Sequence, residues 1–98
     1  MNDLNSVIVE GFVNSEPETT KQGGYDLCMF SVESARFFKK DDAIEKEAST
    51  FWIEAWSKLA TLCQRDCTAG RVLRIVGRLA ERQGKVVVIA EHVELKKS

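Results

Sequence analysis

The stretch that decides the fold is residues 49–69, STFWIEAWSKLATLCQRDCTA, because the spacing of its apolar residues changes partway along. Over residues 49–56 the side chains of the predicted core face, Phe51, Ile53 and Ala55, occur at every second position, which predicts a strand. The other face carries two tryptophans around a carboxylate: Trp52, Glu54 and Trp56. Residues 57–69 place their apolar side chains on one helical stripe. They predict a short helix with Ser57 as its N-cap and Gly70 just after its end.

Further strands are predicted on both sides of this unit. Short runs rich in β-branched residues mark them over residues 6–13, 25–37, 72–81 and 85–95. Gly11 indicates a bulge or a sharp bend in the first run, and Gln83-Gly84 indicates a tight turn between the last two. The charged segment 39–47 lacks a strand period and is predicted to be an exposed, mobile loop. Val86–Ile89 is apolar on both faces, so we expect it to be buried on both sides or to lie at a subunit contact.

The predicted order is β-β-β-α-β-β, all-β with one helix. Five strands with a helix between the third and the fourth follow the plan of the OB-fold, a small Greek-key barrel. We expect one such domain over residues 1–98. OB barrels commonly bind oligonucleotides or oligosaccharides on strands two and three, and the fold alone does not decide between them.

Composition excludes several classes of protein. The chain has 98 residues, 44% of them hydrophobic and 30% charged, as in a small globular domain. No apolar run approaches the ~20 residues that span a bilayer, so no membrane association is expected. Three cysteines without a CxxC spacing predict buried free thiols and a reducing, cytoplasmic environment. With one histidine and no nucleophile–base pairing, we expect neither an enzyme nor a metal site.

Charge is polarised along the chain although the net charge is −1. Residues 1–35 hold one base and six acids, whereas residues 71–98 hold seven bases and three acids. A strongly basic nucleic-acid binder is therefore excluded, but a local basic face is not.

Lysine and arginine residues are interleaved with aromatic residues along the chain, a pattern that suits the binding of single-stranded nucleic acid. Unpaired bases stack on aromatic rings, and lysine and arginine neutralise phosphates. The candidate stacking residues are Phe38, Trp52 and Trp56. The candidate phosphate ligands are Arg36, Lys39, Lys40, Lys58, Arg74, Arg78 and Arg82, of which the last three are spaced by four and share a strand face. The alternatives are tryptophans in the core or at an interface, and arginines on a solvated outer face.

The chain resembles the bacterial-type single-stranded DNA-binding proteins in five segments that follow one another in register. These segments are Leu4–Gly11, Glu16–Glu18, Cys28–Val32, Glu54–Ala60 and Gly70–Leu79. The fourth, EAWSKLA, is similar to the family's VAWGKLA junction between strand and helix. The resemblance implies an OB-fold homotetramer that coats single-stranded DNA in replication, recombination and repair. It also implies a nucleoid-associated cytoplasmic location, no cofactor, and base stacking on Phe38 and Trp56.

The chain departs from the family in two places. The last hairpin turns tightly at Arg82–Lys85, where the family often has a long loop that reaches DNA. The sequence stops at the basic segment Leu95–Ser98 without the family's acidic tail, which recruits replication and repair proteins, so either the tail was left out or this is a tailless variant. The tight last turn, Glu54 and the net charge suggest a second hypothesis, a protein-interaction module such as a primosome-type assembly factor, with weak nucleic-acid binding. A dimer is the alternative to the tetramer.

Overall fold

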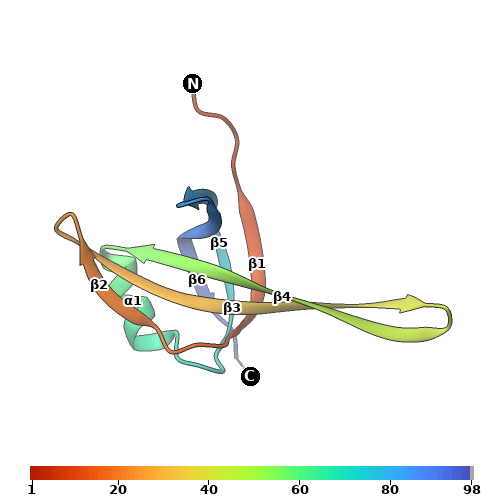
Figure 1. The fold of residues 1–98 in the computed structure, drawn as a ribbon. Coiled ribbons are helices and arrows are strands. Elements are labelled where there is room, and N and C mark those ends of the chain that lie inside the picture. Colours follow the sequence, from red (N-terminus) through yellow and green to blue (C-terminus); the bar gives the residue numbers. More distant parts are fainter. Residues whose placement is uncertain (98) are drawn as a thin grey trace.

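The fold is a closed barrel of five strands with one helix, as the computed structural model describes it for residues 1–97 (Figure 1). The barrel strands are β1 (Val7–Val13), β3 (Tyr25–Lys40), β4 (Ala43–Trp56), β5 (Val72–Arg82) and β6 (Lys85–Leu95). Their order in the sheet is β1-β5-β6-β4-β3, and a second pairing of β1 with β3 closes it. The helix, α1 (Lys58–Asp66), lies between β4 and β5 in the chain. The predicted OB-fold is confirmed.

The core fills the barrel with the alternate side chains of its strands. Its largest fully buried members are Phe30, Ile53, Leu73 and Ile75, and α1 adds Ala60 and Cys63. The three cysteines are buried and free, as their spacing predicts. Burial raises the pKa of the Cys28 thiol.

One prediction about burial is wrong and another holds only in part, because strands continue beyond the barrel. Phe51 is 39% exposed, since it lies where the pairing of β3 with β4 leaves the core. Val88 and Ile89 are buried, but Val86 is exposed near the tip of the hairpin of β5 and β6. Two-sided burial of 86–89 therefore does not hold at Val86, and a subunit contact there stays a prediction.

β3 and β4 form a two-stranded arm where the sequence predicts a loop. Their pairing continues without interruption from Leu27 and Trp56 to Lys40 and Ala43. Asp41 and Asp42 make the turn, with φ angles of 50° and 66°, the positive values of a two-residue hairpin turn. Figure 1 shows this arm projecting from the barrel on the side opposite to α1. The prediction of a loop over 39–47 is wrong because exposed strands carry no apolar alternation.

A short strand before β3 has no counterpart in the prediction. β2 (Glu18–Gln22) pairs with the start of β3 and is exposed at every residue. The pair turns at Gly23 and Gly24, both of which have positive φ. This hairpin lies at the opposite end of the molecule from the arm (Figure 1).

Of the two predicted helix boundaries, the first is correct and the second is wrong. Ser57 is the N-cap residue of α1, as predicted, but its side chain makes no capping bond and its φ is 59°. The helix ends with Cys67 as its C-cap residue. Gly70 lies beyond it, in the turn to β5, where its N–H donates to the carbonyl of Val13 at 2.7 Å.

Two glycines allow strands to approach each other closely. A Cβ on Gly11 would lie 2.0 Å from the carbonyl oxygen of Glu33, next to the point where β1 begins to pair with β3 as well as β5. A Cβ on Gly77 would lie 2.1 Å from the carbonyl oxygen of Ile89. The pairing of β1 with β5 runs unbroken through Gly11, so the irregularity falls elsewhere. It is a register shift beside Gly77 that leaves Glu91 of β6 unpaired.

Candidate nucleic-acid interface

The outer face of β3 and β4 carries both tryptophans. Across the two strands Trp52 opposes Ser31, Glu54 opposes Met29 and Trp56 opposes Leu27. The residues between these pairs point into the core, so the strand period directs all six side chains to the other face. Trp52 is 54% exposed and Trp56 is half-buried. The predicted strand parity of the tryptophans is therefore correct.

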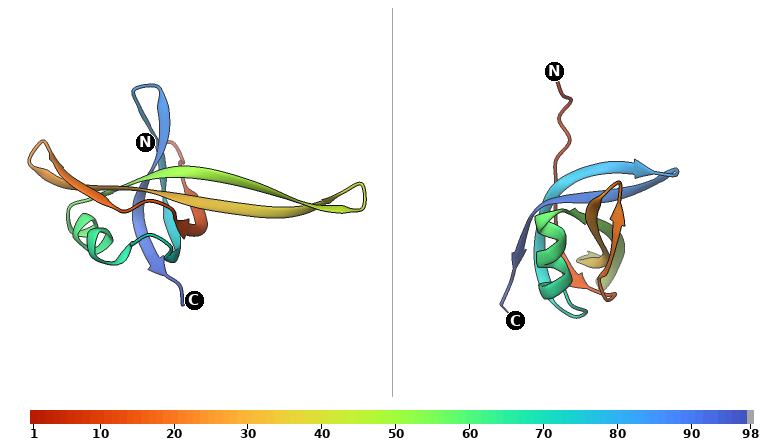
Figure 2. Two further views of the ribbon diagram at one scale, coloured as in Figure 1. Left: turned by 60° about the horizontal axis from the view of Figure 1, so that its bottom comes forward. Right: turned by 90° about the vertical axis from the view of Figure 1, so that its left-hand side faces the viewer.

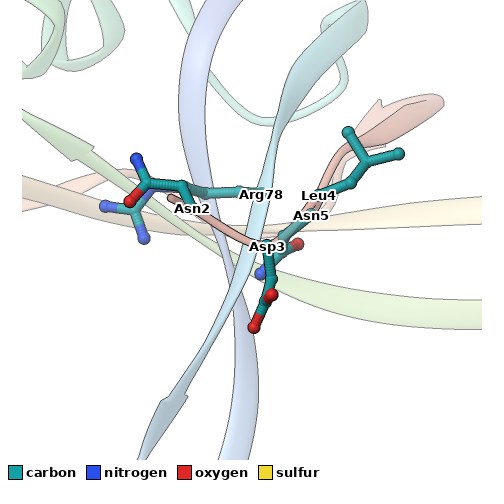
Figure 3. Close-up of a pocket in the computed structure, with 5 residues that line it drawn as sticks. All are labelled: Asn2, Asp3, Leu4, Asn5 and Arg78. Carbon is teal, nitrogen blue, oxygen red and sulfur yellow. The ribbon is translucent and has the colours of Figure 1, made fainter.

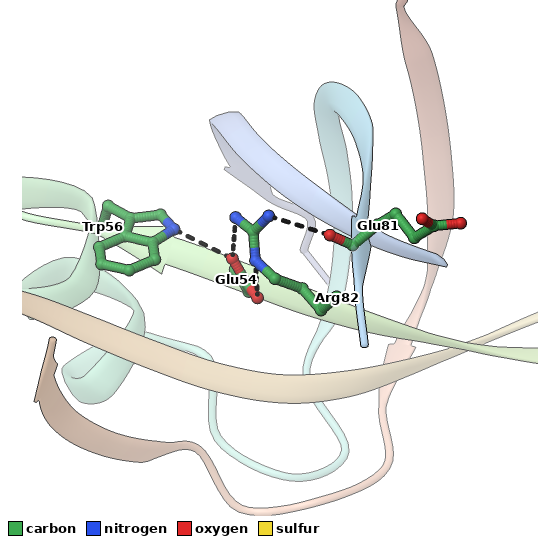
Figure 4. Close-up of polar contacts among 4 residues, drawn as sticks. All are labelled: Glu54, Trp56, Glu81 and Arg82. Atoms are coloured by element: carbon green, nitrogen blue, oxygen red, sulfur yellow. Dashed lines mark hydrogen bonds and ion pairs between the residues drawn. The ribbon is translucent and has the colours of Figure 1, made fainter. Parts of the chain in front are cut away.

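The hairpin of β5 and β6 folds across this face and places Arg82 on Glu54 (Figure 4). The Arg82 Nε donates to Glu54 Oε2 at 3.2 Å, and Nη2 donates to Oε1 at 3.1 Å. The indole Nε1 of Trp56 donates to the same Oε1 at 3.1 Å. Glu54 is only 5% exposed, so three hydrogen bonds stabilise its buried carboxylate.

Two hollows lie on this face, and the pair of Arg82 and Glu54 borders both. The first has a volume of about 630 Å³ and reaches Trp56. It lies between the tip of the β2–β3 hairpin and the tip of the β5–β6 hairpin. The second has a volume of about 310 Å³ and reaches Trp52 beside β6. Met29 also lines both hollows, and Val86 and Val87 give the second an apolar wall. Each tryptophan thus borders a separate space beside one shared guanidinium.

The three arginines of β5 do not form one site. Arg74 binds Glu10 of β1, with Nε and Nη2 each 2.8 Å from Oε2, and Lys96 lies 3.0 Å from the same oxygen. The hydrogen bonds from Lys96 and Arg74 hold the pKa of the Glu10 carboxyl below its usual value. Arg82 lies among the tryptophans instead. The predicted row therefore divides, because Arg74 and Arg82 meet different carboxylates.

Arg78 faces the segment before β1 (Figure 3). It lines a hollow of about 620 Å³ together with residues 2–5. Asn5 fixes this segment to β5, because its side chain donates to the carbonyl of Leu79 at 2.8 Å and accepts from the N–H of Leu79 at 2.9 Å. Arg78 therefore lies at a site apart from the tryptophans.

The arm carries the remaining aromatic and basic candidates except Lys58. The guanidinium of Arg36 lies over the ring of Phe38, 4.9 Å from its centre. Lys39 lies 3.9 Å from Asp42, and Lys40 is exposed at the last pair before the turn. Lys58 is exposed at the first residue of α1.

Phe37 is the aromatic residue of the arm that shares a face with the tryptophans. It opposes Lys46 and is 68% exposed, whereas Phe38 opposes Glu45 on the other face of the arm. Phe38, and not Phe37, is among the stacking residues predicted from the sequence. Continuing the strand parity from Ser31 to residue 37 places Phe37, instead, on the face of the tryptophans.

Two other features would bear on function if the described residues formed them, a metal site and a membrane-spanning helix. Within residues 1–97 no three histidine, cysteine or acidic side chains are placed to hold a metal ion. Nor does that part of the chain contain a helix that is long and apolar enough to cross a membrane.

Sequence comparison assigns the chain to a family. Residues 4–95 match the model of the single-strand binding protein family. The chain is also 33% identical over 82 residues to single-stranded DNA-binding protein 1 of Chlorobaculum tepidum, covering 81% of this chain and 50% of that protein. This chain belongs to the single-strand binding protein family. It spans half the length of this curated relative.

Solved structures agree on the fold of this family member. The Plasmodium falciparum SSB in complex with ssDNA matches with a TM-score of 0.86 and 15% identity, covering 99% of this chain and 98% of that one. The protein PriB from Ralstonia solanacearum matches with a TM-score of 0.82 and 14% identity, covering 97% and 100%. At these identities the matches show the shared fold, and the sequence matches carry the assignment to the family.

Proposed function

We propose that this chain binds and protects single-stranded DNA without sequence preference in replication, recombination and repair. The observation that carries the proposal is the pair of tryptophans beside two hollows on the outer face of β3 and β4. Base stacking on aromatic side chains contributes about 1–3 kcal/mol per base and tolerates any base. The C. tepidum relative carries single-stranded DNA binding in its name, which supports the same function here.

In this proposal the strand follows β3 and β4 from the barrel onto the arm. Trp52 and Trp56 stack bases at the barrel, and Phe37 and Phe38 contact the strand further along. The exposed Lys39, Lys40 and Lys58 meet phosphates, with Arg36 beside Phe38. Arg78 contacts phosphates only if the strand reaches the N-terminal segment, and Arg74 contributes little because Glu10 already neutralises it. Binding requires neither catalysis nor a cofactor.

We also propose that the chain is a homo-oligomer. One edge of β1 pairs with β5 along Val7–Phe12, but the other edge meets β3 only at Phe12 and Val13. Among the described residues, no strand pairs with this second edge of β1 before Phe12, so its N–H and C=O groups there can pair with a strand of another copy. An antiparallel pairing of two β1 strands supports a dimer, from which a tetramer can form. The proposed location is the cytoplasm, at the nucleoid, which the three free cysteines favour.

The first test is a titration of tryptophan fluorescence with oligo-dT of increasing length, at low and moderate salt, with duplex DNA as the control. Quenching by single strands only, weakened by salt, supports the proposal, since phosphate contacts release counterions. The length at which the affinity stops rising gives the site size. Absence of binding at low salt would overturn the proposal.

Trp56→Ala should weaken binding of oligo-dT by about 1–3 kcal/mol if this ring stacks a base. Trp52→Ala is the matched variant, because Trp52 borders only the second hollow. Fluorescence anisotropy of a labelled oligonucleotide measures both variants without relying on their own indoles. An unchanged affinity in a folded Trp56→Ala protein would remove this residue from the site.

The second candidate function is a protein-interaction module that binds nucleic acid weakly. The neutralisation of Arg74 and Arg82 by carboxylates favours it. Such a module should bind its partner protein with a flat response to salt. A steep salt dependence of oligo-dT binding decides for the first function instead.

A further inference from the structure

We propose that Glu54 competes inside the protein with the DNA phosphate for Arg82, and so limits the affinity of the site and its dependence on salt. This inference rests on the proposed binding of single-stranded DNA. It assigns a role to a carboxylate that stacking and phosphate contact do not require. It also explains why an arginine central to the candidate face is not a free cation.

The position of Glu54 makes the competition direct. The Glu54 carboxylate is buried against Arg82, whose side chain is 45% exposed and borders both hollows. A phosphate that joins a base in one hollow to a base in the other would pass over Arg82. The side chain that such a phosphate would meet is therefore already paired with a negative charge.

The hydrogen bonds of Arg82 show how completely it is held. Its Nε and Nη2 donate to Glu54, and Nη1 donates to the carbonyl of Glu81 at 3.3 Å. The donors to Glu54 lie on one edge of the guanidinium, which is the geometry that would also hold two phosphate oxygens. Carboxylate and phosphate therefore compete for the same edge.

The burial of Glu54 decides the competition in the free protein. If Arg82 left for a phosphate, the carboxylate would stay buried with only the indole N–H of Trp56. Removing one partner of a buried ion pair is strongly unfavourable, because the remaining charge loses its compensation. Arg82 therefore stays on Glu54, and its charge adds little to the binding of the strand.

Removing the charge of Glu54 should release Arg82. Glutamine keeps the size of the side chain and an oxygen that can accept from Trp56, but it loses the attraction for the guanidinium. One more free cation on the site should tighten binding and add one phosphate contact. For single strands each contact steepens the slope of log affinity against log salt by about 0.7.

The experiment compares four proteins: wild type, Glu54→Gln, Glu81→Gln and the double variant Glu54→Gln/Arg82→Gln. Glu81→Gln is the matched control, because Glu81 is exposed on the same hairpin and touches Arg82 only through its backbone carbonyl. Both single variants change the net charge equally. Anisotropy of labelled oligo-dT at several salt concentrations gives the affinity and the slope. Thermal unfolding shows that each protein is folded, and Glu54→Val replaces Glu54→Gln if the latter is not.

We expect Glu54→Gln to bind about tenfold more tightly than both wild type and Glu81→Gln, with a slope steeper by about 0.7. The double variant should return to the affinity and slope of wild type. The inference is overturned if Glu54→Gln binds no more tightly than Glu81→Gln, or if the double variant keeps the gain. If none of the four proteins binds oligo-dT at low salt, the proposed function itself fails, whereas the other two outcomes leave it intact.

Discussion

Ser57, between β4 and α1, holds a backbone conformation that glycine adopts far more easily. Its φ and ψ are 59° and −124°, a combination essentially confined to glycine. Two backbone bonds fix it there: its N–H donates to the carbonyl of Asp26 at 2.8 Å, and its carbonyl accepts from Ala60 at 3.0 Å. The family junction VAWGKLA, which this segment resembles, has glycine at this position. Local strain therefore accompanies the sharp entry into the helix.

Ser57→Gly should raise the free energy of unfolding by about 1 kcal/mol. The relief of strain exceeds the added flexibility of glycine in the unfolded chain. Urea denaturation measures the change. Ser57→Ala is the control, because alanine keeps the unfavourable φ. An equal rise in the free energy of unfolding for Ser57→Ala would show that the serine hydroxyl, and not the backbone conformation, is destabilising.

At the level of single residues, the sequence predicts which face of a strand a side chain occupies, but it does not predict which distant side chain it will pair with. The alternation of residues 51–56 correctly places Trp52, Glu54 and Trp56 on one face, because strand parity is local. The partner of Arg74 lies 64 residues away on β1, and that of Arg82 lies 28 residues away on β4. No local pattern contains such pairings. The three arginines share a strand face, as predicted, but the carboxylates that pair with Arg74 and Arg82 could not be predicted, and phosphate contact by the row stays a prediction.

Among the strands and the helix, the arm of β3 and β4 departs most from the expectation. Beyond Glu33 and Thr50 most of its side chains are exposed, so apolar alternation, the main sequence signal for a strand, is missing there. Asp41 and Asp42 form its turn without the glycine that usually marks one. The strands inside the barrel were predictable because each must bury one face.

Shortening the arm should separate DNA binding from folding. Deleting residues 37–40 and 43–46 leaves the turn of Asp41 and Asp42 between Arg36 and Glu47, which already oppose each other. The barrel core is untouched, so the unfolding midpoint should change by only a few degrees, about the effect of 1 kcal/mol. The affinity for long oligo-dT should fall about tenfold or more, and the site size should shrink, as stacking and phosphate contacts are lost. Unchanged binding would exclude the arm from the site.

Gly77→Ala tests the contact between β5 and β6. An added Cβ would meet the backbone of Ile89, which cannot rotate away as a side chain can. The free energy of unfolding should fall by about 3 kcal/mol, as in overpacked cores. Urea denaturation measures it. A loss below about 1 kcal/mol would show that the register shift beside Gly77 lets β6 move aside.

For the whole molecule, the order of the elements was enough to predict the barrel. A helix between the third and fourth barrel strands is a strong constraint on a short chain, and the closing pair of β1 with β3 follows from that plan. The extra strand β2 escaped prediction because it buries nothing. The proposed association between copies of the chain could not be derived in the same way, because one sequence does not show which surfaces of two copies meet.

Ile8→Glu tests the proposed assembly. Ile8 is exposed on β1, and glutamate there would bring two like charges onto one face of an antiparallel pair of β1 strands. The variant should elute as a monomer of 11.0 kDa at micromolar concentration, measured by light scattering after size exclusion. Tyr25→Glu, on the exposed hairpin of β2 and β3, should leave the assembly intact. A wild type that is already monomeric would contradict the proposal.

The uninterrupted pairing of β3 with β4 also limits how such an arm can vary in evolution. Inserting one residue in each strand would turn every side chain beyond it to the opposite face, so Phe37 would exchange sides with Phe38. Pairs of residues in both strands preserve the faces and extend the arm by about 7 Å at a time. The reach of the arm among relatives should therefore change in discrete steps, while its two faces keep their chemistry.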